Sequence, residues 1–194
     1  MRFFLVLACF LFSAACISGR RSSEVDRLAQ VDPEHAVWAS VLATFISDST
    51  RQLVIVDSAR PIPERIINGQ TLSARFPEIN AEFIRRYVEA NASSRAMPAF
   101  ADVEVPVVRV TDAALAPFRG AGGPNEYWNG FYGTYPDSPG LIRLFRVGFD
   151  PLMEQALVFV THSCGGRCGS GTYTLLSKVN GVWVVVGRSV ALAN

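Results

Sequence analysis

The chain has 194 residues, 49% of them hydrophobic, and this length favours one domain with a substantial buried core. Its 18 basic and 17 acidic residues give a formal net charge of +1 at pH 7. A balance this even carries no general electrostatic attraction to nucleic acid, so the composition predicts no nucleic-acid partner.

The first 15 residues have the pattern of a secretory signal peptide. Arg2 supplies a positive charge, residues 3–12 form an apolar core, and residues 13–15 are the small residues of a cleavage site. The apolar run is shorter than the ~20 residues that a transmembrane helix needs. The sequence therefore predicts an exported protein of the periplasm, the cell envelope or the external medium.

Cys16 follows the predicted cleavage site, where a bacterial lipoprotein carries the cysteine that becomes acylated. Ala14 and Ala15 fit that pattern, whereas Ser13 stands where an aliphatic residue is usual. Two alternatives stay open: Cys16 is a lipid anchor and the only tie to the membrane, or it is removed by further cleavage. The polar residues 16–31 predict a tether that leads into a single α+β domain at 32–194.

In the first half of that domain, helix caps and hydrophobic spacing define the expected elements. A helix is predicted over 33–47, because Asp32 is a good N-cap, Pro33 suits the first turn, and Trp38 begins an apolar face at helical spacing. The other expected elements are a buried strand at 52–57, a loop at 58–70, a helix at 77–91, and a strand at 103–110 in which Pro106 indicates either an edge position or a bulge.

Thr111 should cap a short helix that ends near Pro117, before a glycine-rich joint at 120–124. A further helix is expected through the aromatic residues at 127–135. We interpret its apolar face as packed against the C-terminal strands. The alternative is that Tyr127, Tyr132 and Tyr135 are exposed and form a stacking surface for a glycan or a peptide.

The last third of the chain contains four β-like segments, at 141–149, 156–162, 172–178 and 182–190. Asp150-Pro151 and Asn180-Gly181 are turn pairs, and the second is a strong hairpin signal. The expected fold is α+β, with a C-terminal four-stranded antiparallel meander packed with N-terminal helices. Residues 164–171 are expected to form the loop between its second and third strands.

Several runs in this region resemble a family of uncharacterised secreted bacterial proteins. They are EYWNGFYGTYPDSPG at 126–140, RVGF at 146–149, QALV at 155–158 and CGGRCGSG at 164–171. The resemblance is specific over roughly residues 125 to 190, and Phe145 departs from it where a small polar residue is expected. It implies an exported α+β protein, and because the family has no established activity it implies no catalytic residue.

Cys164 and Cys168 are the cysteine pair left once Cys9 and Cys16 are set aside, and a structural disulfide is the ordinary state of such a pair in an exported protein. A structural zinc site needs four ligands, and only His162 stands nearby, so no metal site is predicted. The spacing of the cysteines differs from a two-residue redox motif, although Arg167 would favour a thiolate at Cys168.

Two functions remain open. The first is a non-catalytic binding or structural domain of the envelope, whose partner is a protein or a glycan and whose binding surface comprises His162, Arg167, Tyr127, Tyr132 and Tyr135. The second is a hydrolase or thiol–disulfide enzyme centred on residues 162–171. No cofactor and no catalytic residue are predicted, because the chain carries no Gly-x-Ser-x-Gly motif and no P-loop.

Overall fold

The computed structural model describes residues 32–63, 66–67, 69–120 and 123–193. The chain divides into two units, Met1–Asp32 and Pro33–Asn194, and the fold of the second unit is mixed α and β. The predicted signal peptide, Cys16 and the tether fall on residues 1–31, outside the described residues, as do two residues of the glycine-rich joint.

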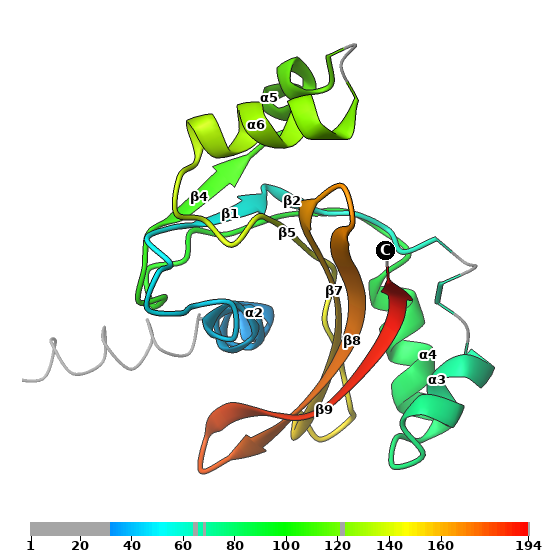
Figure 1. The fold of residues 1–194 in the computed structure, drawn as a ribbon. Coiled ribbons are helices and arrows are strands. Elements are labelled where there is room, and N and C mark those ends of the chain that lie inside the picture. Colours follow the sequence, from blue (N-terminus) through cyan, green and yellow to red (C-terminus); the bar gives the residue numbers. More distant parts are fainter. Residues whose placement is uncertain (1–31, 64–65, 68, 121–122, 194) are drawn as a thin grey trace, which may run out of the picture. The chain divides into compact units, whose positions relative to one another are not determined.

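A large, mostly antiparallel sheet is the centre of this unit (Figure 1). In the described residues it has seven strands in the order β4-β1-β5-β7-β8-β9, with β6 also paired to β7. β1 runs parallel to β4 and β5, and the remaining pairs are antiparallel. The strands are β1 Leu53–Val56, β4 Val107–Val110, β5 Leu141–Leu144, β6 Gly148–Phe149, β7 Gln155–Gly165, β8 Cys168–Val179 and β9 Val182–Ala193.

Helices cover both faces of this sheet. Successive strand residues point to opposite sides, and on β7 both sides carry apolar residues that need to be buried. α2 packs on the face that carries Val158, whereas α3 and α4 pack on the face that carries Leu157. α5, η1 and α6 lie against β1 and β4. The helices are α2 Pro33–Ala43, α3 Gly69–Arg75, α4 Ala81–Ala90, α5 Asp112–Leu115, η1 Ala116–Phe118 and α6 Pro124–Thr134, and a small second sheet pairs β2 Ser58–Ala59 with β3 Arg95–Ala96.

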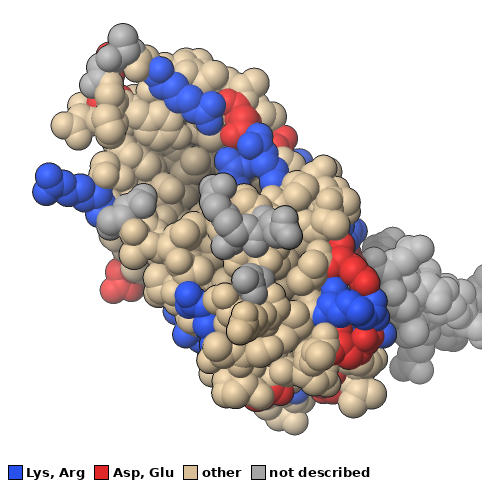
Figure 2. All heavy atoms as spheres, turned by 90° about the vertical axis from the view of Figure 1, so that its right-hand side faces the viewer, with Lys and Arg blue, Asp and Glu red and all other residues tan. Residues whose placement is uncertain are grey.

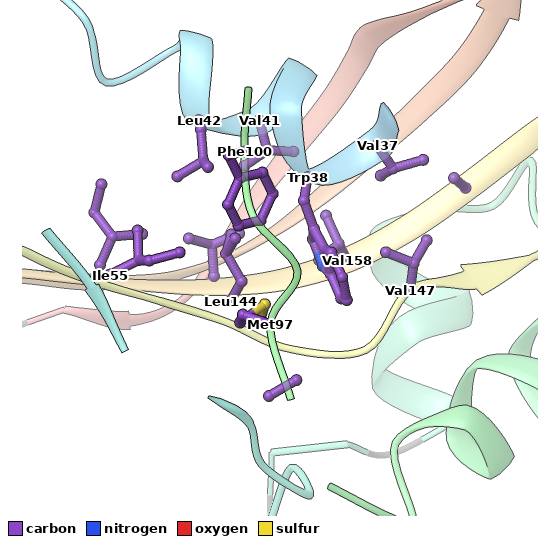
Figure 3. Packing of buried hydrophobic residues seen from close by; sticks show 14 of the residues in the cluster. Val37, Trp38, Val41, Leu42, Ile55, Met97, Phe100, Leu144, Val147 and Val158 are labelled. Atoms are coloured by element: carbon purple, nitrogen blue, oxygen red, sulfur yellow. The ribbon is translucent and has the colours of Figure 1, made fainter. Parts of the chain in front are cut away.

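The first predicted helix forms and fills the core beneath the sheet. Trp38 is fully buried, and its indole Nε1 donates to the carbonyl of Phe145 at 2.9 Å. Figure 3 shows Val37, Trp38 and Leu42 of α2 directed toward side chains of the strands. α2 ends at Ala43 and not at Ser47, since the hydroxyl of Thr44 bonds the carbonyl of Val41 and tightens the last turn.

The helix predicted at 77–91 forms, but it begins four residues later, at Ala81. Asn80 caps α4, its side chain accepting from the amide of Phe83 at 2.9 Å, so the helix begins after Pro77. The loop predicted at 58–70 is wrong at its end, because α3 begins at Gly69. A helix this short is not stable alone, and burial of Leu72 on α3 supplies the tertiary packing that stabilises it.

The C-terminal strands are antiparallel as predicted, yet they are not a self-contained four-stranded meander. Parallel β1 and β4 extend the sheet beyond β5. β4 lies at the sheet edge, one of the two positions that Pro106 indicated, but it covers only Val107–Val110 of the predicted 103–110. The first predicted segment divides into β5 and β6. Between them the chain turns toward α2 and α4, where Arg146 contacts Glu34 and Asn91.

A buried carboxylate ties α2 to this connection. Glu34 is 4% exposed and accepts from Nε and Nη2 of Arg146, from Arg95 and from the amide of Val147, at 2.7–3.2 Å. Arg146 and Val147 lie more than a hundred positions after Glu34 in the sequence, and Arg95 lies 61 positions after it. The contact therefore joins distant parts of the chain. No helix in the described part of the chain combines the length and apolar character that a membrane crossing requires.

Candidate functional site

The predicted loop at 164–171 is instead the end of a long hairpin. β7 continues to Gly165 and β8 starts at Cys168, which leaves Gly166 and Arg167 as the turn. The Cα atoms of Cys164 and Cys168 are 5.0 Å apart, and the two side chains form a disulfide. It links the strands next to the turn, where Arg167 is exposed at the tip.

Backbone packing fixes the position of Cys164. Gly140 has φ +126° and lies so close to the hairpin that a Cβ would come within 2.3 Å of the carbonyl oxygen of Ser163, so only glycine fits there. From the other side, the hydroxyl of Tyr132 donates to the carbonyl of Cys164 at 3.1 Å. The structure thus brings Tyr132 and the disulfide together.

His162 is half-buried between the hairpin and the end of α2. Its Nε2 lies 2.8 Å from the carbonyl oxygen of Pro139, and because a carbonyl only accepts, Nε2 carries the hydrogen. Nδ1 lies 3.9 Å from Sγ of Cys164, which as a disulfide sulfur has no hydrogen to donate. The ring centroid of Phe45 lies 5.2 Å away on α2's side of the sheet.

A groove of about 160 Å³ opens beside His162, between the end of α2 and the sheet; we call it the His162 groove. Arg188 on β9 and Thr174 face each other across the strands in its wall. Within the described residues, Arg188 and Thr172 have no hydrogen-bonding partner for their side chains. The lining is Val41, Thr44, Phe45, Val160, His162, Ser170, Thr172, Thr174 and Arg188.

The predicted tyrosines lie in the aromatic cluster of α6, which packs mainly on β1 and β4 and reaches the C-terminal strands, as expected, through Leu141 of β5 and Cys164 of β7. Tyr127 and Phe131 are parallel at 6.4 Å, and Tyr135 lies 5.2 Å from Phe131. All three tyrosines are half-buried, and burial raises the pKa of Tyr127 and of Tyr132. Of the three, only Tyr132 bonds to the hairpin.

A second polar cluster was not anticipated from the sequence. Asp112, the first residue of α5 and two residues after β4, forms ion pairs with Arg60, with Arg143 at 3.2 Å and with Arg119 at 3.5 Å. Desolvation alone would raise the pKa of Asp112, but the hydrogen bond and charge of Arg143, with the charges of Arg60 and Arg119, lower it below its ordinary value. The one local signal was Arg143 itself, a charge inside an apolar strand.

Charged groups elsewhere are scattered. On the face drawn in Figure 2, basic and acidic side chains stand in small groups separated by uncharged surface. Across the residues with a described position, no three His, Cys, Asp or Glu side chains are grouped so that they could hold a metal ion. Comparison with known proteins gives no matching family model, no matching curated protein and no matching solved structure, so the family resemblance of residues 125–190 stays a prediction.

Proposed function

We propose that this protein is an exported, non-catalytic binding domain of the cell envelope that holds a glycan or a protein partner at the His162 groove. The observation that carries the proposal is the groove's polar lining, in which the guanidinium of Arg188 and the hydroxyl of Thr172 have no hydrogen-bond partner among the described residues. Arg188 offers charged donors without a neighbouring carboxylate. Phe45 adds a ring at the groove's edge, and polar groups beside an aromatic ring suit a sugar or a polar side chain.

The arrangement of His162 favours binding over hydrolysis. A hydrolase would direct the imidazole at a nucleophile within hydrogen-bonding reach. Ser170 pairs with His162 across the strands, yet the two ring nitrogens are directed at Pro139 and Cys164. The imidazole is therefore engaged with the hairpin itself, which supports a fixed binding surface.

The binding proposal can be tested by retention on two materials: isolated peptidoglycan sacculi, which present glycan, and solubilised envelope proteins. Arg188→Gln and Thr172→Val should each weaken retention on one of them, by about tenfold for the charged group, since a hydrogen bond from a charged donor contributes about 1.5–3 kcal/mol. Arg85→Gln, on the exposed surface of α4, is the matched control. Equal retention of all four proteins on both materials would contradict the proposal.

One observation favours a second candidate, thiol–disulfide exchange with an external dithiol. Nδ1 of His162 is 3.9 Å from Sγ of Cys164, whereas Cys168 is exposed. A thiolate of the dithiol would attack Sγ of Cys168, the disulfide would break, and the departing Cys164 thiolate would take a proton from protonated His162. The second thiol of the partner would then release Cys168 and leave the partner oxidised.

Cysteine variants distinguish this candidate from a structural disulfide. With the partner in its disulfide form, the Cys168 thiolate of Cys164→Ser should attack that disulfide, release one partner thiolate and accumulate as a mixed disulfide, because no second cysteine can resolve it. Non-reducing electrophoresis and peptide mass mapping would detect this species, whereas Cys168→Ser should not accumulate it. If the disulfide is purely structural, neither variant accumulates a partner, and the double serine variant loses only about 2 kcal/mol of stability because the closed loop is short.

Export is also part of the proposal, and it rests on the sequence of residues 1–16. Mass spectrometry of the native protein should find its N-terminus at or after Cys16. If Cys16 is acylated, Cys16→Ala should move the protein from the membrane fraction to the soluble fraction. An intact Met1 on exported material would contradict the predicted cleavage.

A further inference from the structure

The cluster around Asp112 lies at one edge of the parallel part of the sheet. β4, β1 and β5 run in the same direction, so their carboxyl ends meet at the same edge. Asp112 follows β4, Arg143 is the third residue of β5, and Arg60 follows the short strand that comes after β1. In open sheets with parallel strands, the space beyond the carboxyl ends is where ligands usually bind.

Charge is not balanced within this cluster. Arg60, Arg119 and Arg143 bring three positive charges, and Asp112 brings one negative charge. In the part of the chain with described positions, none of the three arginines has an ion pair with another carboxylate. The four side chains therefore carry a net charge of +2, which attracts an anion from solvent.

Arg143 shows where that counter-charge would bind. Its Nη2 donates to Oδ1 of Asp112 at 3.2 Å, while its Nη1 is buried and has no hydrogen-bond partner. A buried donor without a partner destabilises a fold, and an arginine fork is shaped to hold two oxygens of one oxyanion. Arg60 and Arg119 are more than half exposed, at 53% and 57%, so they remain accessible to a ligand that arrives from solvent.

We propose that Arg143, Arg60 and Arg119 form a binding site for a phosphate group, with Asp112 holding the three guanidinium groups in place. A phosphate monoester or inorganic phosphate carries close to two negative charges near neutral pH and matches the excess, whereas a carboxylate would neutralise only half of it. The site is separate from the His162 groove and does not depend on the function proposed for that groove.

Isothermal titration of the mature protein at low salt tests the site, with inorganic phosphate, glycerol 3-phosphate and acetate as probes. Phosphate or its ester should bind at one site per chain, at least tenfold more tightly than acetate, because its charge is about twice as large. Tighter binding of glycerol 3-phosphate than of inorganic phosphate would identify an ester as the ligand, and the reverse order would identify the free ion.

Arg143→Gln should abolish phosphate binding, and Arg60→Gln and Arg119→Gln should each weaken it several-fold. The matched control is Arg51→Gln, because Arg51 is also exposed but bonds only the backbone of Asp48. If Arg143→Gln does not fold, as judged by circular dichroism, the two exposed variants decide the result. Binding no tighter than that of acetate, or an equal loss in Arg51→Gln, would overturn the proposal.

Discussion

Replacing Glu34 with alanine should be among the most damaging single changes to this fold outside its apolar core. The carboxylate is 4% exposed and is the common acceptor for Arg146, Arg95 and the amide of Val147. Removing it takes the Glu34 carboxylate away from the guanidinium of Arg146, which lies 2.7 Å from it and whose side chain is only 19% exposed. Breaking a buried pair in this way costs about 3–5 kcal/mol.

We expect the lower end of that range, about 3 kcal/mol, since Arg95 is 40% exposed and water can solvate part of the site. For a unit of this size, each kcal/mol lowers the melting temperature by about 2–4 °C, so Glu34→Ala should melt about 6–12 °C lower. Urea unfolding of the mature protein should show a midpoint lower by about 1–2 M with an unchanged slope, because the surface exposed on unfolding is the same.

Two controls make this measurement decisive. Glu89→Ala removes a carboxylate from an exposed i,i+4 pair with Arg85 and should leave the urea midpoint almost unchanged. The double variant Glu34→Ala/Arg146→Ala should lose less than the sum of the two single variants, because the guanidinium of Arg146 is removed together with the carboxylate that it contacts. If Glu34→Ala and Glu89→Ala unfold at the same urea concentration, the assignment of Glu34 as the tie between α2 and the sheet is wrong.

Two further predictions concern close packing and alkaline pH. Gly148→Ala should lower the free energy of unfolding by about 1–3 kcal/mol, because its Cβ would lie 2.5 Å from Cα of Tyr87. Gly133→Ala in α6 is the control and should be neutral or stabilising, since nothing lies within 4 Å of a Cβ there. Equal urea midpoints for the two variants would contradict this. Burial raises the pKa of Tyr173 to about 12, so its contribution is complete below about pH 10, the ordinary tyrosine pKa, and is lost as the pH rises through 12. The urea midpoint should fall over that range, and fall less steeply in Tyr173→Phe.

Local sequence signals were sufficient for several elements of the fold. The helix at Pro33, the capped turn at Thr111, the aromatic helix before Tyr135 and the hairpin at Asn180-Gly181 all lie where cap residues and apolar spacing predicted them. Each of these depends on residues within about one or two turns of the chain, which a single sequence displays directly.

The shape of the hairpin was decided by contacts that the sequence does not display. The glycines at 165–171 predicted a loop, yet the strands continue through them because Thr161 pairs with Gly171 and Ser163 with Gly169. A Cβ on Gly171 would come within 2.7 Å of Cζ of Phe159, so this glycine makes room for a ring of the core and is not a sign of an irregular loop. Glycine alone cannot distinguish these two uses.

Only the tertiary structure joined the residues of the two candidate sites. Asp112 meets Arg60 across 52 positions and Arg143 across 31, and the groove beside His162 draws on α2, β7, β8 and β9. Apolar residues at regular spacing predict which face of a helix or strand is buried. Charged and hydroxyl side chains follow no such spacing, so the sequence does not show which of them will contact one another. The sequence therefore predicted most of the elements, but the register of parallel β1 between β4 and β5 determined which polar side chains came together.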